Sequence, residues 1–208
     1  MLRMTADRDP QDAERADSRA GCFASSRGIG GTDTGTSEDV RRRVAAGDVV
    51  VTDELPPGAS KTAHGGTAIA VLRASPEQVW RVILDYRGHP RFYPHVTAAD
   101  VVEMDERRAI VHYRVTIGPL SFGFYMEKYP DPRRRRVEWH LAEGRPHGPF
   151  RENSGYWQIN PTDDGAASLV TYAIAVRTVL PASVTAGGES ASLTETMIGL
   201  RKLVEVPH

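Results

Sequence analysis

The sequence predicts an α+β fold in which a curved antiparallel sheet of about seven strands wraps around a long C-terminal helix, with two short helices after the first strand. Three features predict it: a series of alternating apolar segments joined by short turns, a strong helix start after the first of them, and an amphipathic C-terminal segment. Strands joined by short turns pair antiparallel, and each has one apolar face that needs a cover. The C-terminal helix is expected to supply that cover.

The first strand of the patterned region, Thr67 to Arg73, leads directly into a helix. Ser75 stands at the N-cap position, Pro76 at the first helical position and Gln78 at the third, which is a strong helix-start signal. A second, very short helix or turn is expected at Arg91 to Tyr93.

Six further strands are expected to follow as a meander, over 99–104, 109–117, 121–129, 134–142, 150–159 and 167–178. Alternation sets which side chains point inward, and a register slip of one residue would reverse each assignment. Phe122, Phe124 and Met126 share the inward face of the third of these strands. Four charged or titratable residues are expected on the outer, solvated face: Arg114, Glu127, Glu138 and His140.

The C-terminal helix is predicted from Leu193, Met197, Leu200 and Val204, which are spaced four, three and four residues apart and form a core-facing stripe. The pair Gly187–Gly188 interrupts any longer helix and is a candidate hinge for ligand entry. The loop from Glu143 to Pro149 and the Phe92–Tyr93 turn are the alternative entry points.

The N-terminal part divides into two segments. Residues 1–37 contain few large apolar side chains and are expected to be a disordered tail. Residues 38–65 are expected to form an extension with a short helix, ended by Gly47, and a short strand at Asp48 to Thr52. Residues 66–206 then form the ligand-binding domain.

Composition excludes several classes of function. The net charge of −1 over 208 residues gives no global field that attracts nucleic acid or an anionic membrane. One cysteine, Cys22, permits no intramolecular disulfide, and the seven histidines show no metal-ligand spacing, so no metal and no cofactor is expected. No apolar run approaches the roughly 20 residues that cross a bilayer, and no signal peptide is expected. We expect a cytoplasmic protein without stable membrane insertion, either a monomer or a homodimer.

Several short motifs, in order along the chain, resemble the StAR-related lipid-transfer and birch-pollen-allergen superfamily over about residues 66–205. The polyketide cyclase/dehydrase and coenzyme Q-binding protein family is the nearest resemblance within it. The motifs are Ala74-Ser75-Pro76-Glu77-Gln78-Val79-Trp80, Asp85-Tyr86 with Tyr93-Pro94, Gly155-Tyr156-Trp157-Gln158-Ile159-Asn160-Pro161, and Thr171-Tyr172. The resemblance implies a helix-grip fold and does not select a function, because one fold hosts many functions.

An apolar cavity between the sheet and the C-terminal helix is the expected ligand site. The alternative is that the same side chains simply fill the core, although so many aromatic residues around one helix would be a bulky filling. The candidate ligand-binding residues are Phe92, Tyr93, Tyr113, Phe122, Phe124, Trp139, Trp157, Tyr172, Leu193, Met197 and Leu200.

Three functions are compatible with this pattern. The first is non-catalytic binding or carriage of a hydrophobic small molecule such as a lipid, a quinone or an aromatic polyketide. The second is a polyketide cyclase or aromatase, which would need an inward Arg, His or carboxylate near the tyrosines. The third, implied by the resemblance, is a protein- or ribosome-binding regulator with a vestigial cavity. The four-arginine run Arg133 to Arg136 is an ordinary solvated hairpin end, and no nucleic-acid partner is expected.

Overall fold

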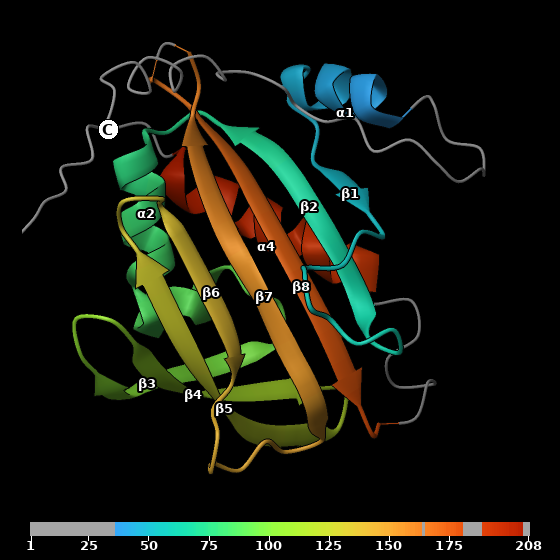
Figure 1. The fold of residues 1–208 in the computed structure, drawn as a ribbon, viewed down its shortest axis with the longest axis vertical. Helices are drawn as coiled ribbons and strands as arrows, with labels where there is room; N and C mark the ends of the chain where they lie inside the picture. Colours follow the sequence, from blue (N-terminus) through green and yellow to red (C-terminus); the bar gives the residue numbers. More distant parts are fainter. Residues whose placement is uncertain (1–35, 164, 181–188, 206–208) are drawn as a thin grey trace, which may run out of the picture. The chain divides into compact units, whose positions relative to one another are not determined.

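The computed structural model describes residues 36–163, 165–180 and 189–205. Eight strands form one antiparallel sheet in the order β1-β2-β8-β7-β6-β5-β4-β3 (Figure 1). The elements are α1 Thr36–Ala45, β1 Val50–Thr52, β2 His64–Leu72, α2 Pro76–Leu84, the 3₁₀ helix η1 Tyr86–Arg91, β3 Val96–Met104, β4 Ala109–Ile117, β5 Leu120–Asp131, β6 Arg136–Leu141, β7 Phe150–Pro161, β8 Ser168–Thr178 and α4 Glu189–Val204.

The sheet is curved and the C-terminal helix α4 covers one of its faces, which confirms the predicted α+β helix-grip architecture (Figure 1). The sheet has eight strands rather than about seven. The additional strand is β1, which the sequence had placed in the N-terminal extension. β1 pairs with β2 through Val50 opposite Ile69, and the Val50 side chain is buried in the core.

The start of α2 shows why the chain turns sharply after β2. The backbone N–H of Gln78 donates to the Ser75 hydroxyl at 3.3 Å, and the Ser75 N–H donates to the Gln78 side-chain oxygen at 2.9 Å. This reciprocal capping box is the predicted one. Asp85 then ends α2 and accepts a hydrogen bond from the Gly88 N–H, which begins η1 immediately.

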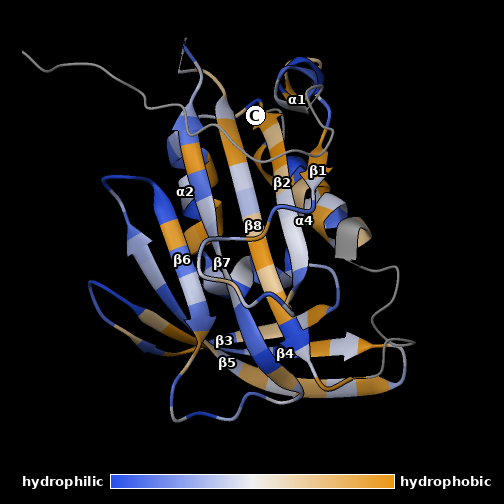
Figure 2. Cartoon of the chain, turned by 45° about the vertical axis from the view of Figure 1, so that its right-hand side comes forward, coloured by the Kyte–Doolittle hydropathy of each residue, from blue (hydrophilic) through white to orange (hydrophobic). Residues whose placement is uncertain are grey.

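Strands β3 to β8 form the predicted meander, and β8 returns to pair with β2. Figure 2 shows hydrophobic stretches along β4, β5 and β8, whereas α1 is mainly hydrophilic. On the outer face Arg114, Glu138 and His140 are exposed, as expected. Glu127 lies on the same face but is buried beneath Arg108, whose guanidinium donates to its carboxylate at 2.5 Å.

The apolar stripe of α4 packs against the sheet as predicted, with Leu193, Met197, Leu200 and Val204 all buried. Near Gly199 the helix backbone comes very close to the segment after η1: a Cβ atom at Gly199 would lie 2.9 Å from the Cα of Phe92. No helix in the described part of the chain is long and apolar enough to span a bilayer.

Candidate functional site

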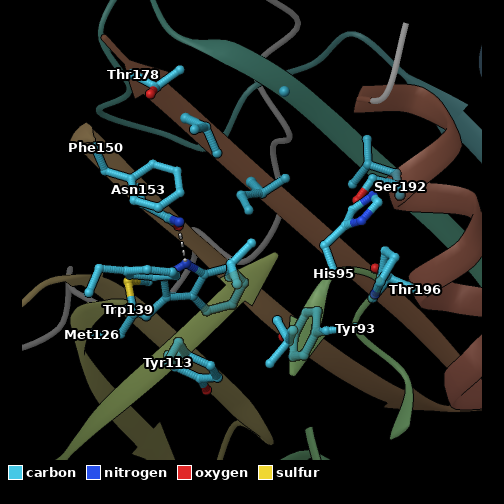
Figure 3. Close-up of a pocket in the computed structure, with 18 of the residues that line it drawn as sticks. Tyr93, His95, Tyr113, Met126, Trp139, Phe150, Asn153, Thr178, Ser192 and Thr196 are labelled. Atoms are coloured by element: carbon cyan, nitrogen blue, oxygen red, sulfur yellow. Dashed lines mark hydrogen bonds between the residues drawn. The ribbon is translucent and has the colours of Figure 1, made fainter. Parts of the chain in front are cut away.

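A cavity of about 280 Å³ lies between the inner face of the sheet and the first half of α4. Figure 3 shows Met126 and Trp139 of the sheet on one side and Ser192 and Thr196 of α4 on the other. The segment between η1 and β3 forms a third wall, from Tyr93 to Val96. The wall residues contributed by the strands include Tyr113 and Val115 of β4, Phe124, Met126 and Lys128 of β5, Trp139 of β6, Phe150 and Asn153 of β7, and Tyr172 and Ile174 of β8.

The cavity has a buried interior and an exposed rim. Tyr113, Trp139 and Tyr172 are each 4% exposed, whereas His64 and His95 on the rim are exposed to solvent. Tyr93 belongs to the wall, and ligand entry at the Phe92–Tyr93 turn or at the loop over residues 143–149 stays a prediction. The Gly187–Gly188 hinge lies outside the described residues.

The structure divides the candidate ligand-binding residues into two groups. Those on the cavity wall are Tyr93, Tyr113, Phe124, Trp139, Tyr172 and Leu193. The other group, Phe92, Phe122, Trp157, Met197 and Leu200, is not part of the wall, which differs from the sequence prediction.

The second group lies outside the wall for two physical reasons. Trp157 stacks on Tyr172 at 4.2 Å between ring centroids and also contacts Phe92, and Met197 and Leu200 on α4 are completely buried. These residues fill the space where the helix approaches the sheet closely. Phe122, in contrast, lies near the start of β5 and packs edge-on against Phe150, with 5.7 Å between their ring centroids.

A buried hydrogen bond holds the Tyr113 hydroxyl at the cavity wall. His89 Nε2 lies 2.9 Å from the Ile83 carbonyl oxygen, and His89 Nδ1 lies 2.7 Å from the Tyr113 hydroxyl. Because a carbonyl oxygen can only accept, Nε2 carries the ring proton. Burial, with the nearby Lys128 charge, holds the pKa of His89 well below its usual value, so the ring is neutral and Nδ1 accepts from Tyr113.

Tyr93 is fixed at the wall in a similar way. The Trp157 indole N–H donates to the Tyr93 hydroxyl at 2.7 Å. Burial raises the pKa of Tyr93 although hydrogen bonds from Trp157 and Tyr172 act in the opposite direction. The phenol therefore stays protonated at physiological pH.

Lys128 is a buried amine on the same wall. The residue is 3% exposed, and its Nζ lies 4.7 Å from the ring centroid of Trp139, 5.5 Å from that of Tyr113 and 5.9 Å from that of Tyr86. Burial lowers its pKa from 10.5 to about 7. The ring faces partly compensate an ammonium by cation–π attraction, and none of the described carboxylates forms an ion pair with it.

Asn153 adds a second polar group beside Trp139. The Trp139 indole N–H donates to the Asn153 side-chain oxygen at 3.3 Å, which Figure 3 marks with a dashed line. Because an indole N–H can only donate, the amide oxygen must face it. The amide NH₂ of this buried wall residue makes no hydrogen bond within the described part of the chain.

Sequence reasoning missed three polar groups, namely Lys128 and Asn153 on the cavity wall and His89 behind Tyr113. The signal for two of them was present. Lys128 is two residues beyond Met126 on the inward face of β5, and Asn153 is four residues before the inward Trp157 of β7. His89 carried no such signal, because its partners Ile83 and Tyr113 come from other elements.

A curved antiparallel sheet that encloses a cavity with its C-terminal helix defines a START-like, helix-grip protein. Residues 72–197, more than half of the chain, match the family model described as polyketide cyclase / dehydrase and lipid transport. The chain belongs to this family.

Solved structures share the fold at low sequence identity. An aromatase/cyclase from Streptomyces sp. R1128 is 17% identical with a TM-score of 0.55, over 66% of this chain and 91% of that one. A START superfamily protein from Mycobacterium smegmatis is 16% identical with a TM-score of 0.55, over 67% and 95%. A STAR-related lipid transfer protein from Xanthomonas axonopodis is 12% identical with a TM-score of 0.55, over 76% and 99%. No curated protein matches the sequence. Family and fold support hydrophobic ligand binding or a cyclase-like function.

Proposed function

We propose that this protein binds and carries one hydrophobic small molecule in the cavity between the sheet and α4, without catalysing a reaction on it. The observation that carries the proposal is the cavity itself, about 280 Å³ with a largely aromatic and aliphatic wall. Burial of the ligand supplies the affinity, at about 25 cal/mol per Å² of apolar area.

The volume limits the size of the ligand. An apolar protein cavity of about 150 Å³ accommodates benzene. A cavity of about 280 Å³ is almost twice as large, so it has room for roughly two fused rings or a chain of similar bulk. A longer tail would leave the cavity through the rim beside His64 and His95.

The Tyr113–His89 pair supports binding without chemistry. Burial raises the pKa of Tyr113 and lowers that of His89, so the proton stays on the phenol and transfer to the imidazole is unfavourable. The Tyr113 hydroxyl already donates its proton in the hydrogen bond to His89 Nδ1. Toward a ligand, Tyr113 therefore offers a hydrogen-bond acceptor rather than an acid or a base.

Calorimetric titration with 2-naphthalenemethanol, a neutral two-ring probe, tests the proposal. We expect one site per chain in the wild type and at least about a tenfold loss of affinity in Thr196→Phe, because the added ring occupies the cavity beside the buried Thr196. Ile198→Phe is the matched control, since Ile198 lies on the same helix and is exposed. No binding to the wild type, or equal binding to wild type and Thr196→Phe, would contradict the proposal.

A cyclase or related proton-transfer enzyme is the second candidate, and Lys128 favours it. An amine with a pKa of about 7 in an apolar cavity is poised to take a proton from the carbon beside a bound carbonyl. The test is deuterium exchange into the methyl group of 2-acetylnaphthalene in D₂O. If the wild type accelerates this deuterium exchange and Lys128→Met does not, the result would favour the enzyme over the carrier.

A further inference from the structure

We propose that the natural ligand carries an anionic oxygen, a carboxylate or an acidic phenol, and that the Lys128 ammonium binds this group inside the cavity. The inference rests on the proposed function, because it names the class of molecule that the same cavity binds. It assigns one end of the ligand to the part of the wall formed by β5 and β6.

The first argument is the isolation of Lys128. A fully buried lysine is normally paired, because an uncompensated charge in an apolar site is costly. Lys128 is 3% exposed and no described carboxylate forms an ion pair with it. The adjacent carboxylate, Glu127, points to the opposite face of the sheet and is occupied by Arg108. The expected partner of Lys128 is therefore a group that enters the cavity.

The second argument is the charge of the surroundings. The titratable groups around Lys128 are Tyr86 and His89 from η1 and Tyr113 from β4, and β6 contributes the uncharged Trp139. Burial raises the pKa of both tyrosines and lowers that of His89, so all three are neutral near pH 7. No described neighbour competes with a ligand anion for the ammonium.

A second donor lies beside the same indole. The Asn153 oxygen accepts from Trp139, which leaves the NH₂ without a hydrogen bond to any described residue, and Lys128 Nζ lies over the Trp139 ring. An anionic oxygen that meets both donors gains charge-assisted hydrogen bonds, which are stronger than neutral ones. An alcohol or an ester of the same shape gains much less.

The test compares two probes that differ in one group, 2-naphthoic acid and 2-naphthalenemethanol, by calorimetry at pH 6.5. Wild type is expected to bind the acid about tenfold or more tightly than the alcohol, as charged hydrogen bonds imply. Lys128→Met should lose this preference and keep its affinity for the alcohol. Lys202→Met, the same substitution at an exposed position of α4, should behave as wild type.

A second measurement on the wild type alone covers the case in which Lys128→Met does not fold. The free amine has a pKa of about 7, and an anion beside it raises that pKa. Titrations at pH 7.5 in two buffers of different ionisation enthalpy should therefore report proton uptake with the acid and none with the alcohol.

The outcomes separate the two proposals. Equal affinity for acid and alcohol in the wild type, or no proton uptake with the acid, would overturn the role of Lys128 and leave the carrier function intact. Binding of neither probe would overturn the carrier function and this inference together.

Discussion

The two halves of α4 face the same sheet and yet perform different tasks. The first half presents Ser192, Leu193 and Thr196 to the apolar cavity, whereas Met197 and Leu200 of the second half are completely buried in the core and Val204 borders a separate, more polar pocket beside α2. The two halves of α4 differ because different segments of the chain pack against them. The segment after η1 comes close to the helix backbone at Gly199, whereas the Leu193 side chain of the first half lies beside Gly66 of β2, which carries no side chain. The apolar cavity therefore lies beside the first half of α4.

The sharpest way to break this comparison is to make the same substitution in both halves. Leu200→Ala should lower the free energy of unfolding by about 3–5 kcal/mol, because a fully buried leucine leaves a new void in a packed region. Leu193→Ala should cost about 2 kcal/mol, since Leu193 borders existing space and has fewer partner atoms to lose. Urea unfolding followed by circular dichroism measures both.

The same two substitutions should also differ in their effect on binding. Leu193→Ala enlarges the cavity and should change the affinity for 2-naphthalenemethanol, whereas folded Leu200→Ala should bind it as the wild type does. Equal losses of stability together with equal effects on binding would show that the two halves of the helix do not differ.

The pH dependence of stability separates the cavity wall from the packed half in a second way. The pKa of Lys128 is about 7 in the folded protein against 10.5 when unfolded, so the unfolded state binds more protons between these values. Stability should therefore rise with pH in this window, by on the order of 3 kcal/mol between about pH 7 and 9.5.

Lys128→Met provides the reference for this rise. His89 contributes nothing in the window, because its lowered folded pKa affects stability only as the pH falls through and below its ordinary value of 6.5. The buried tyrosines, whose pKa values are raised, act at higher pH. Subtracting the free energy of unfolding of the variant from that of the wild type at each pH isolates the contribution of Lys128. A difference that does not change with pH would mean that this amine is not desolvated.

The sequence predicted the fold well because the fold depends on local patterns. Ser75 and Gln78 place the start of α2, and alternation places β4, which begins and ends at the predicted residues Ala109 and Ile117. The count of strands differed because β1 is only three residues long and its partner β2 follows at a distance.

The cavity was harder to predict than the fold. The spacing of Leu193 and Leu200 shows that both face the sheet, but periodicity does not tell how far the sheet lies from each. Only the tertiary arrangement distinguishes Trp139, which lines the cavity, from Trp157, which lies in the packed core. Lys128 was predictable from alternation, and it became informative only when the structure showed that none of the described carboxylates forms an ion pair with it.

Gly199→Ala probes the contact that closes the packed half, and two effects of known size oppose each other there. Alanine is favoured over glycine inside a helix by about 1 kcal/mol. Its Cβ, however, would lie 2.9 Å from both the Cα and the carbonyl oxygen of Phe92, which are backbone atoms that cannot turn aside. Overpacking of this kind costs about 1–3 kcal/mol, so we expect a net loss of about 1 kcal/mol in urea unfolding. Ile198→Ala, at the exposed neighbouring position, should stay within about 0.5 kcal/mol of the wild type. A stabilised Gly199→Ala would mean that helix propensity decides at this site and that α4 can move away from Phe92, in which case the packed half is as adaptable as the half that lines the cavity.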